Sequence, residues 1–305
     1  MSIPDTLYKA HATGNDFVVY EDSEGRYDPT ADEVRFLCDR HRGIGGDGLL
    51  RLTHPEHVAD MSSSMLGECA NASARWFMDY RNADGSVAEM CGNGTRAITL
   101  FAQRRGMMPS TVGSSFALGT RAGVKILTYL GDVPPYGRDV FRVDMGAWDM
   151  GDSDGYRVTI PGSAGSASGT FVDMGNPHVV AVVDDGVSDL PSVEELDLVH
   201  KPVVEPVIES DQNVEFVRVD AMPADGCQSA DPAVGRATMR VNERGCGETL
   251  SCGTGLCATA VVLRSRTGVR SWDITVRGGT LRVDVSDNAV SLTGSATIVA
   301  RVELF

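Results

Sequence analysis

The chain has 305 residues, of which 42% are hydrophobic and 23% are charged, and its formal net charge is −15. This composition is typical of a folded protein with enough residues for two domains. The acidic balance disfavours binding to nucleic acid or to an anionic membrane, because both carry negative charge.

The N-terminal sequence and the cysteines exclude further classes. The chain begins MSIPD, without a basic start or an apolar signal core, and it has no run of about 20 apolar residues. We therefore expect a cytoplasmic protein. Seven cysteines with no CxxC pair argue against a disulfide framework, and six histidines without an HExxH pattern argue against zinc. We expect neither a metal nor another cofactor.

In chain order, the first half shows a β-rich segment, a glycine-rich turn, a mostly apolar helix and a further β-like run. These are predicted at residues 16–20, 91–94, 95–105 and 123–129. The second half repeats the order, at residues 179–183, 252–255, 256–266 and 280–285. A helix that is apolar around most of its surface is usually buried on all sides. We therefore expect each helix at the centre of its half.

The other segments are predicted as connections, surface and one returning strand. Residues 129–137 contain GDVPPYG and are the expected hinge between the halves. Residues 53–74, 184–209 and 223–234 are rich in Ser, Asp, Glu or Pro and are expected to be surface elaborations. Residues 297–305 are β-like and are expected to complete the first sheet.

Two short sequences recur at one offset. TGNDFVV at 13–19 resembles MGNPHVV at 174–180, and MCGNG at 90–94 resembles SCGTG at 251–255, in both cases 161 residues apart. A weaker match, TRAGV at 120–124 with VRGGT at 276–280, lies near that offset. The repeat predicts an α/β fold of the α+β type, with two duplicated domains related by a pseudo-two-fold axis. Each would be a curved sheet or barrel around a central helix. The predicted domains are residues 1–135, completed by 297–305, and residues 138–296.

Each repeat places a cysteine just before a predicted helix, Cys91 in the first half and Cys252 in the second. The N–H groups and dipole there are expected to lower a thiol pKa and to hold a carboxylate. Inversion at a Cα atom requires a base on one face and an acid on the other. Two thiols brought to one cleft would supply both without a cofactor. The alternative, inert cysteines in turns that only pack helices, is disfavoured by the repetition.

Further polar residues lie near the repeats. Four asparagines are predicted at strand ends or turns: Asn15, Asn82, Asn176 and Asn213. Singly each suits a turn, but together they would recognise a second ammonium and carboxylate. Glu243 and Arg244 would bind the two ends of a zwitterion, with a surface ion pair as the alternative. His178 would tune a nearby thiol, although a lone histidine is more often structural.

The motifs, taken in order, resemble those of the diaminopimelate epimerase family, and as a set they are highly specific. The matching sequences span nearly the whole chain: HATGNDF at 11–17, NADGS at 82–86, MCGNG at 90–94, GNPH at 175–178, NVEF at 213–216, ERGCGET at 243–249 and CGTG at 252–255.

The resemblance implies interconversion of LL- and meso-diaminopimelate, in bacterial lysine and cell-wall biosynthesis. It implies Cys91 and Cys252 as the acid–base pair, His178 and Glu243 as residues that tune them, and a homodimer. The residues implied to hold the distal end of the substrate are Asn15, Asn82, Asn176, Asn213, Glu243 and Arg244. The residues implied to hold the reacting carboxylate through backbone N–H groups are Gly92, Asn93, Gly253 and Thr254.

The chain departs from the family pattern at three places. Its opening HATG replaces the common His-Gly-x-Gly, Gly48 stands where many members have a substrate-binding Gln, and Cys246 is an extra thiol near Cys252. Three other functions remain open: a proline-racemase-type enzyme, a thiol-redox protein in which Cys91 and Cys252 form a reversible disulfide, and a non-catalytic amino-acid-binding module. Racemases of that type usually have His after the first Cys-Gly, whereas Asn93 stands here.

Overall fold

The computed structural model describes residues 2–183, 186–223 and 233–305. The chain forms two compact units, Met1–Asp144 with Gly294–Phe305, and Met145–Thr293. The domain boundaries predicted from the sequence stay a prediction beside these units. In the residues that the structure describes, no helix has the length and apolar character that crossing a membrane requires.

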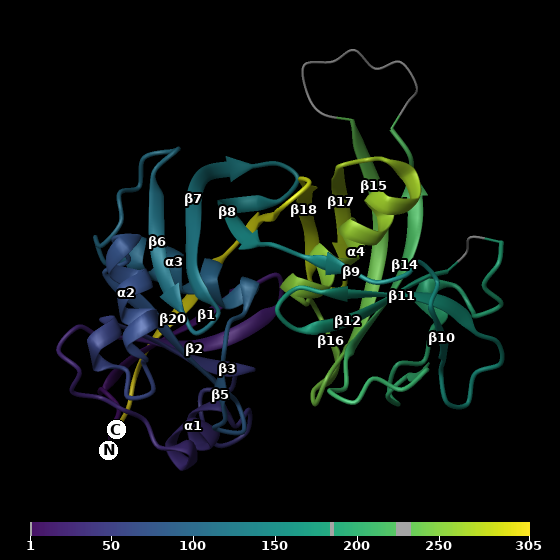
Figure 1. Ribbon diagram of the computed structural model, residues 1–305. Helices are drawn as coiled ribbons and strands as arrows, with labels where there is room; N and C mark the ends of the chain where they lie inside the picture. Colours follow the sequence, from purple (N-terminus) through teal and green to yellow (C-terminus); the bar gives the residue numbers. More distant parts are fainter. Residues whose placement is uncertain (1, 184–185, 224–232) are drawn as a thin grey trace. The chain divides into compact units, whose positions relative to one another are not determined.

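The first unit is a curved sheet with one central helix. Its elements are β1 (Thr6–Ala12), β2 (Asn15–Asp22), α1 (Ala31–Cys38), β3 (Gly48–Thr53), η1 (Pro55–His57), α2 (Ser63–Asn71), β4 (Trp76–Asn82), β5 (Val87–Ala88), α3 (Gly92–Arg104), β6 (Ser115–Thr120), β7 (Gly123–Val133), β8 (Gly137–Gly146) and β20 (Thr297–Glu303). Helix α3 is buried from its first residue to Gln103 and contacts β1, β2, β3, β4, β6, β7 and β20. Figure 1 shows it inside the curve of these strands.

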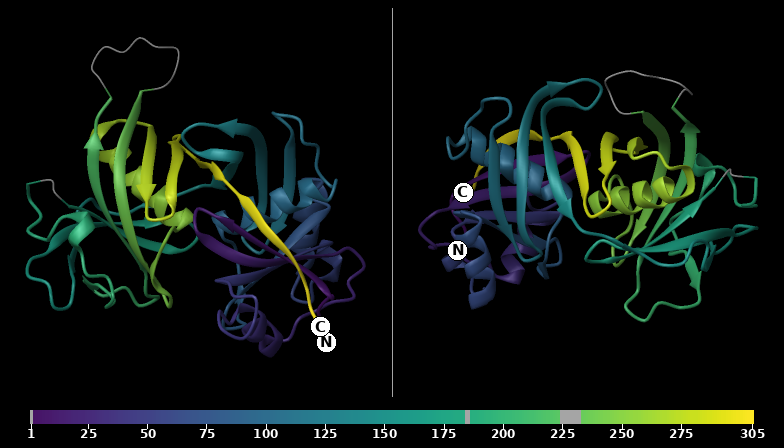
Figure 2. Two further views of the ribbon diagram at one scale, coloured as in Figure 1. Left: turned by 180° about the vertical axis from the view of Figure 1, so that it is seen from behind. Right: turned by 45° about the horizontal axis from the view of Figure 1, so that its top comes forward.

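The strands of the first unit pair in the order β20–β1–β2–β3–β4–β6–β7–β8. The pairs β2–β3 and β4–β6 are parallel and the others antiparallel. Strand β5 lies beside β4. The pairing of β20 with β1 confirms that the end of the chain returns to the first sheet, and Figure 2 shows the two chain ends close together.

The second unit repeats this architecture. Its elements are β9 (Asp149–Met150), β10 (Tyr156–Thr159), β11 (Ala167–Asp173), β12 (Pro177–Val182), η2 (Val193–Glu195), β13 (Val203–Glu205), β14 (Asn213–Ala221), β15 (Val234–Glu243), β16 (Gly247–Thr249), α4 (Gly253–Thr267), β17 (Ser271–Val276), β18 (Gly279–Val285) and β19 (Val290–Ser295). Helix α4 is central and contacts β11, β12, β14, β17 and β18.

Its strands pair in the order β10–β11–β12–β14–β15–β17–β18–β19, with β12–β14 and β15–β17 parallel. The parallel pairs therefore occupy the same places in the strand order as in the first unit. Strand β16 lies beside β15 as β5 lies beside β4. This match confirms the predicted duplication of a curved sheet around a buried helix. The weak third sequence match falls on equivalent hairpins, β6–β7 and β17–β18.

The predicted hinge was wrong, whereas the predicted surface elaborations contain short elements of regular structure. Residues 129–137 are not a hinge, because they form the end of β7 and its turn into β8, a hairpin of the first unit. A proline- and glycine-rich run marks a turn without saying which strands it joins. Residues 53–74 contain α2, whose Ser62 cap accepts a hydrogen bond from the Met65 N–H. Residues 184–209 contain η2 and β13. Of residues 223–234, the stretch 224–232 lies outside the described residues.

Both central helices begin earlier than predicted, at Gly92 and Gly253 rather than at residues 95 and 256. Glycine is a poor helix former, so a reading of residue preferences delays the start past a glycine-rich turn. The earlier start makes Cys91 and Cys252 the N-cap residues of α3 and α4, both with extended backbone. Each cysteine is thus fixed at the end of a buried helix.

Candidate active site

Cys91 is half-buried and sits in a small network of asparagines. Its sulfur accepts a hydrogen bond from the Gly94 N–H at 3.4 Å, as an N-cap side chain does. Its thiol donates to Asn15 Oδ1 at 3.4 Å, and Asn93 Nδ2 donates to the same oxygen at 3.3 Å. The structure therefore brings together three of the residues predicted for the first half.

Two residues that the sequence reasoning missed hold these asparagines. Asp47 accepts from Asn15 Nδ2 at 2.7 Å and is itself paired with Arg40 at 2.8 Å. Arg96 is fully buried in α3 and donates to Asn93 Oδ1 at 2.6 Å. A charged side chain inside an apolar helix was the available signal for Arg96, because such a residue is rarely buried without partners.

An acidic residue next to Asn15 belongs to the same cluster. Burial alone would raise the pKa of Asp16, but hydrogen bonds from Arg40 and Lys9 hold that pKa well below its usual value. Asp16 is therefore ionised throughout the physiological range. The Lys9 and Arg40 side chains that bind the Asp16 carboxylate hold the start of β2, and Asn15 in this part of β2 contacts the Cys91 thiol.

The remaining first-half positions are less directly placed. Asn82 ends β4, and its Nδ2 donates to Ser86 Oγ at 3.0 Å across the turn into β5. At Gly48 a Cβ atom would lie 2.6 Å from the backbone oxygen of Arg81, so no side chain fits there without movement. A Gln-like contact from this position is absent in this chain.

Cys252 is 5% exposed, and its surroundings differ from those of Cys91. No N–H of the first turn of α4 donates to its sulfur, which instead lies 3.6 Å from Thr254 Oγ1. Asn176 Nδ2 donates to that hydroxyl oxygen at 3.4 Å. His178 Nε2 lies 3.1 Å from Asn176 Oδ1, and His178 Nδ1 lies 2.8 Å from Glu215 Oε1.

Glu243 completes the group around Cys252. It ends β15, and the Thr249 hydroxyl donates to its Oε1. Burial raises the pKa of Glu243; hydrogen bonds from Thr249 and Cys252 act in the opposite direction, and the Glu215 charge adds to the rise. Glu215 and Thr249 were missed from the sequence. The signal for Glu215 was one acid within the apolar run of β14.

The expectation that the helix end lowers the thiol pKa was wrong for Cys252. Burial raises the pKa of this thiol well above its usual value, and the negative charges of Glu243 and Glu215 raise it further. The dipole of α4 is outweighed because the sulfur is desolvated and receives no backbone hydrogen bond. Cys252 is therefore protonated at neutral pH.

The predicted distal-end residues of the second half lie at one end of β14 and β15. Asn213 Oδ1 accepts from the Arg244 backbone N–H at 2.9 Å, and its Nδ2 donates to the Pro177 carbonyl at 3.3 Å. The Arg244 guanidinium is exposed and donates to the Ser210 carbonyl at 3.0 Å. The residues predicted to bind a carboxylate through backbone N–H groups, Gly92, Asn93, Gly253 and Thr254, occupy the first turns of α3 and α4.

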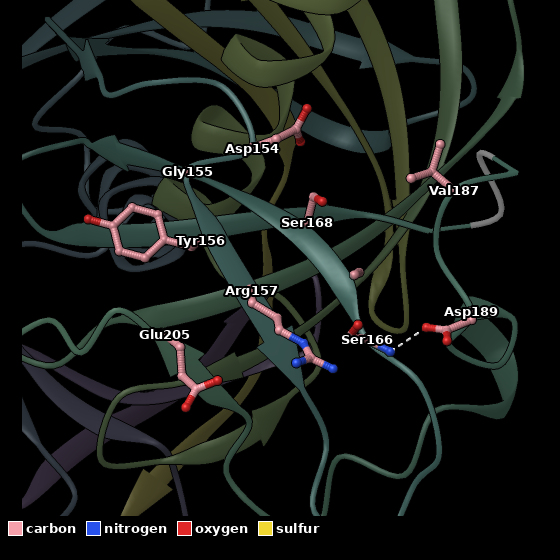
Figure 3. Close-up of a pocket in the computed structure, with 10 residues that line it drawn as sticks. Asp154, Gly155, Tyr156, Arg157, Ser166, Ser168, Val187, Asp189 and Glu205 are labelled. Atoms are coloured by element: carbon pink, nitrogen blue, oxygen red, sulfur yellow. Dashed lines mark hydrogen bonds between the residues drawn. The ribbon is translucent and has the colours of Figure 1, made fainter.

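A separate pocket of about 550 Å³ lies on the second unit, around β10 and β11. Figure 3 shows the carboxylates of Asp154, Asp189 and Glu205 on its wall, together with the Arg157 guanidinium. Its lining includes none of the predicted site residues. The candidate active site is therefore defined by the cysteine clusters rather than by this pocket.

The architecture is shared with solved structures. A probable proline racemase from Agrobacterium radiobacter K84 superposes with a TM-score of 0.63 at 15% identity, covering 98% of this chain and 92% of that one. A PhzF-family phenazine biosynthesis protein from Bacillus anthracis gives a TM-score of 0.60 at 13% identity, covering 98% of both chains. The fold thus defines a class of duplicated α/β proteins that includes the proline racemase and PhzF folds.

Sequence comparison narrows the class. The profile of the family described as "Diaminopimelate epimerase" matches residues 7–148 and 170–299, which include every candidate site residue. Proteins named diaminopimelate epimerase are 37% identical in Thermobifida fusca, over 96% of this chain and 95% of that protein, and 39% identical in Corynebacterium aurimucosum, over 97% and 98%. The chain belongs to the diaminopimelate epimerase family and is an isomerase.

Proposed function

We propose that this protein interconverts LL- and meso-2,6-diaminopimelate without a cofactor, using Cys91 and Cys252 as its acid and base. Family membership supports the substrate and the reaction. The observation that carries the mechanism is the repeated one: each unit holds a cysteine at the N-cap of its buried central helix. A duplicated fold with a thiol at each equivalent point supplies the two proton-transfer groups that inversion requires.

The proton balance of the proposed step is simple. A thiolate takes the α-proton and becomes a thiol, and the second thiol delivers a proton to the opposite face and becomes a thiolate. Negative charge spreads onto the substrate carboxylate in between. Backbone N–H groups in the first turns of α3 and α4 stabilise that charge, since a helix N-terminus attracts an anion. The roles exchange when the reaction runs backwards.

The polar residues around each thiol are assigned to binding and tuning. Glu243 and His178 set the protonation of Cys252. The distal amino and carboxylate groups are bound by the set Asn15, Asn82, Asn176, Asn213, Glu243 and Arg244. The exposed Arg244 guanidinium suits the distal carboxylate, because its planar fork matches two oxygens. We further infer a cytoplasmic homodimer without nucleic-acid or membrane partners, to be checked by light scattering of the purified protein.

The test is proton exchange in D2O. The reduced protein, dialysed against a chelator, is incubated with LL-diaminopimelate, and the α-protons are followed by NMR with chiral chromatography of the product. We expect meso product with deuterium at one α-carbon, and a loss of at least about 100-fold in Cys91→Ser and in Cys252→Ser. Exchange on L-proline alone would assign the racemase activity instead. Full activity in either variant would refute the two-thiol mechanism.

A further inference from the structure

A buried acid lies beneath Cys252. In the parallel pair β12–β14, His178 is opposite Asn213 and Val180 is opposite Glu215. Side chains two apart on a strand share a face, so the imidazole of His178 and the carboxylate of Glu215 lie on the same face of the sheet. The carboxylate packs against the start of α4, where a Cβ on Gly255 would lie only 2.5 Å from Glu215 Oε1.

The first unit supplies an internal reference for this pair. In the equivalent parallel pair β2–β3, Phe17 is opposite Gly48 and Val19 is opposite Leu50. A Cβ on Gly94, the counterpart of Gly255, would meet Leu50 Cδ2 at 3.4 Å. Phe17 and Leu50 therefore stand where the second unit has an imidazole and a carboxylate. Apolar side chains fill the same space, so packing alone does not call for ionisable groups under Cys252.

Glu215 is costly for stability where it lies. It is 0% exposed, and among the described residues its Oε2 has no hydrogen-bond partner. A buried carboxylate that is not fully hydrogen-bonded is less favourable for stability than a well-packed apolar side chain. A group kept at such cost is a candidate for a role in the chemistry nearby.

The contacts of Glu215 lead directly to the thiol. Glu215 Oε1 lies 2.8 Å from His178 Nδ1, and the other ring nitrogen, Nε2, lies 3.1 Å from Asn176 Oδ1, so contacts on both nitrogens fix the orientation of the imidazole. Asn176 in turn holds the Thr254 hydroxyl, and that hydroxyl lies next to the Cys252 sulfur. The described contacts thus form one hydrogen-bonded chain from a buried acid to a cysteine. Within the described part of the protein, one further acid joins this hydrogen-bonded chain: Glu243, which is hydrogen-bonded to Cys252.

We propose that Glu215 is a positioning residue that orients His178 and, through Asn176 and Thr254, holds the Cys252 thiol for proton transfer. The first unit has Leu50 at the position of Glu215 and therefore has no equivalent positioning acid, so the surroundings of the two thiols control them differently. This inference rests on the proposed role of Cys252. It concerns a residue that acts through others, because Glu215 touches neither the sulfur nor bulk solvent.

The test compares Glu215→Gln with Glu194→Gln, which removes an exposed carboxylate paired with Arg218 in the same unit. Alkylation of Cys252 and of Cys91 by iodoacetamide is followed against pH, with tandem mass spectrometry to separate the sites. Because the Glu215 charge raises the Cys252 pKa, its removal should move the Cys252 profile to lower pH. The Cys91 profile should not move. We expect kcat to fall at least about tenfold with little change in KM.

A double variant, His178→Phe with Glu215→Leu, copies the first unit and keeps the proposal testable if a single change prevents folding. It removes both partners together, so it should fold better than Glu215→Leu alone, which strands the imidazole. The kcat of this double variant should be lower than that of wild type, and the pH dependence of its Cys252 alkylation should differ from that of wild type. An unchanged Cys252 profile and kcat in folded Glu215→Gln would overturn the proposal. Loss of thermal stability with an unchanged Cys252 profile would do so too, because the role would then be structural.

The two failures are distinguishable. If Cys252→Ser keeps full activity, the proposed function fails, whereas the alkylation profiles still report whether Glu215 controls the thiol. If both cysteine variants are inactive and Glu215→Gln behaves as Glu194→Gln does, the proposed function stands and the role of Glu215 is refuted.

Discussion

Replacing Gly255 by Ala tests how closely the buried acid packs under α4. The added Cβ would lie 2.5 Å from Oε1, 3.1 Å from Cδ and 3.2 Å from Cγ of Glu215. Ordinary contact distances are about 3.5–4.0 Å, so the carboxylate would have to withdraw by roughly 1 Å. That movement stretches or breaks its 2.8 Å hydrogen bond to His178.

The expected loss follows from these distances. Overpacking costs about 1–3 kcal/mol, and loss of a hydrogen bond to a charged group costs about 1.5–3 kcal/mol. Alanine regains up to about 1 kcal/mol over glycine in a helix. We therefore expect Gly255→Ala to lower the free energy of unfolding by about 2–4 kcal/mol, and to lower kcat because the carboxylate and imidazole no longer meet.

Gly94→Ala is the matched control, because Gly94 has the same place in α3. Its Cβ would meet Cys91 Cβ and Leu50 Cδ2 at 3.4 Å, which is close to ordinary contact. The free energy of unfolding should stay within about 1 kcal/mol of wild type. Urea unfolding followed by tryptophan fluorescence reports the second unit through Trp272, which is fully buried in β17.

The result that refutes this reasoning is Gly255→Ala with the stability and kcat of Gly94→Ala. A second arm locates the cause. In Gly255→Ala combined with Glu215→Asp, the shorter acid leaves room for the methyl group, so the two changes should cost less together than the sum of their separate losses. Additive losses would show that Glu215 is not what the methyl group meets.

Three further predictions concern the first unit. Thr30→Ala removes the N-cap of α1 and should cost about 1 kcal/mol in urea unfolding, whereas Thr30→Ser should cost little. Gly48→Gln should lower stability and leave KM no better, because its Cβ meets the backbone oxygen of Arg81; improved substrate binding would contradict the packing. Burial would raise the pKa of Asp79, but pairing with Arg81 and Arg121 holds it below the usual value. Its stabilisation is therefore present above about pH 4 and lost as the pH falls through the folded-state pKa. Wild type should lose more stability than Asp79→Asn between pH 7 and pH 3, and parallel losses would count against the ion pairs.

The fold was largely predictable from local sequence. The repeat of glycine-rich turn and apolar helix indicated the duplication, because a helix that is apolar all round has to be enclosed. Glycines and turn residues that bound β-like runs located the strands that follow each helix. Residues 129–137 were misjudged, since proline and glycine mark a turn without revealing which strands it joins. Only the strand partners, which are set by tertiary contacts, make β7 and β8 a hairpin.

The sequence pointed to the cysteines and asparagines of the candidate site but not to the residues that hold them. Asp47 and Glu215 are acids whose roles depend on partners 32 and 37 residues away in the chain. No local pattern links Glu215 to His178, because their contact arises from the parallel register of β12 and β14. The Cys252 pKa was misjudged for a related reason: a helix start is visible in a sequence, whereas desolvation and nearby carboxylates are not.

The divergence of the two duplicated units bears on the proposed mechanism, in which one thiol would serve as both acid and base. A protonated Cys252 suits donation to the substrate, since burial, Glu243 and Glu215 all favour the neutral thiol. The reverse reaction requires the same sulfur to accept a proton, and an unassisted buried thiolate beside two carboxylates is unfavourable. A positive charge brought by the substrate's α-ammonium would offset that cost only while substrate is bound. The His178 imidazole belongs to the same network, with its Nδ1 2.8 Å from Glu215 Oε1. In the proposed mechanism, reversibility at Cys252 would depend on a polar pair that the first unit replaces with Phe17 and Leu50. Cys91 would meet the same requirement through Asn15 and the Gly94 N–H instead.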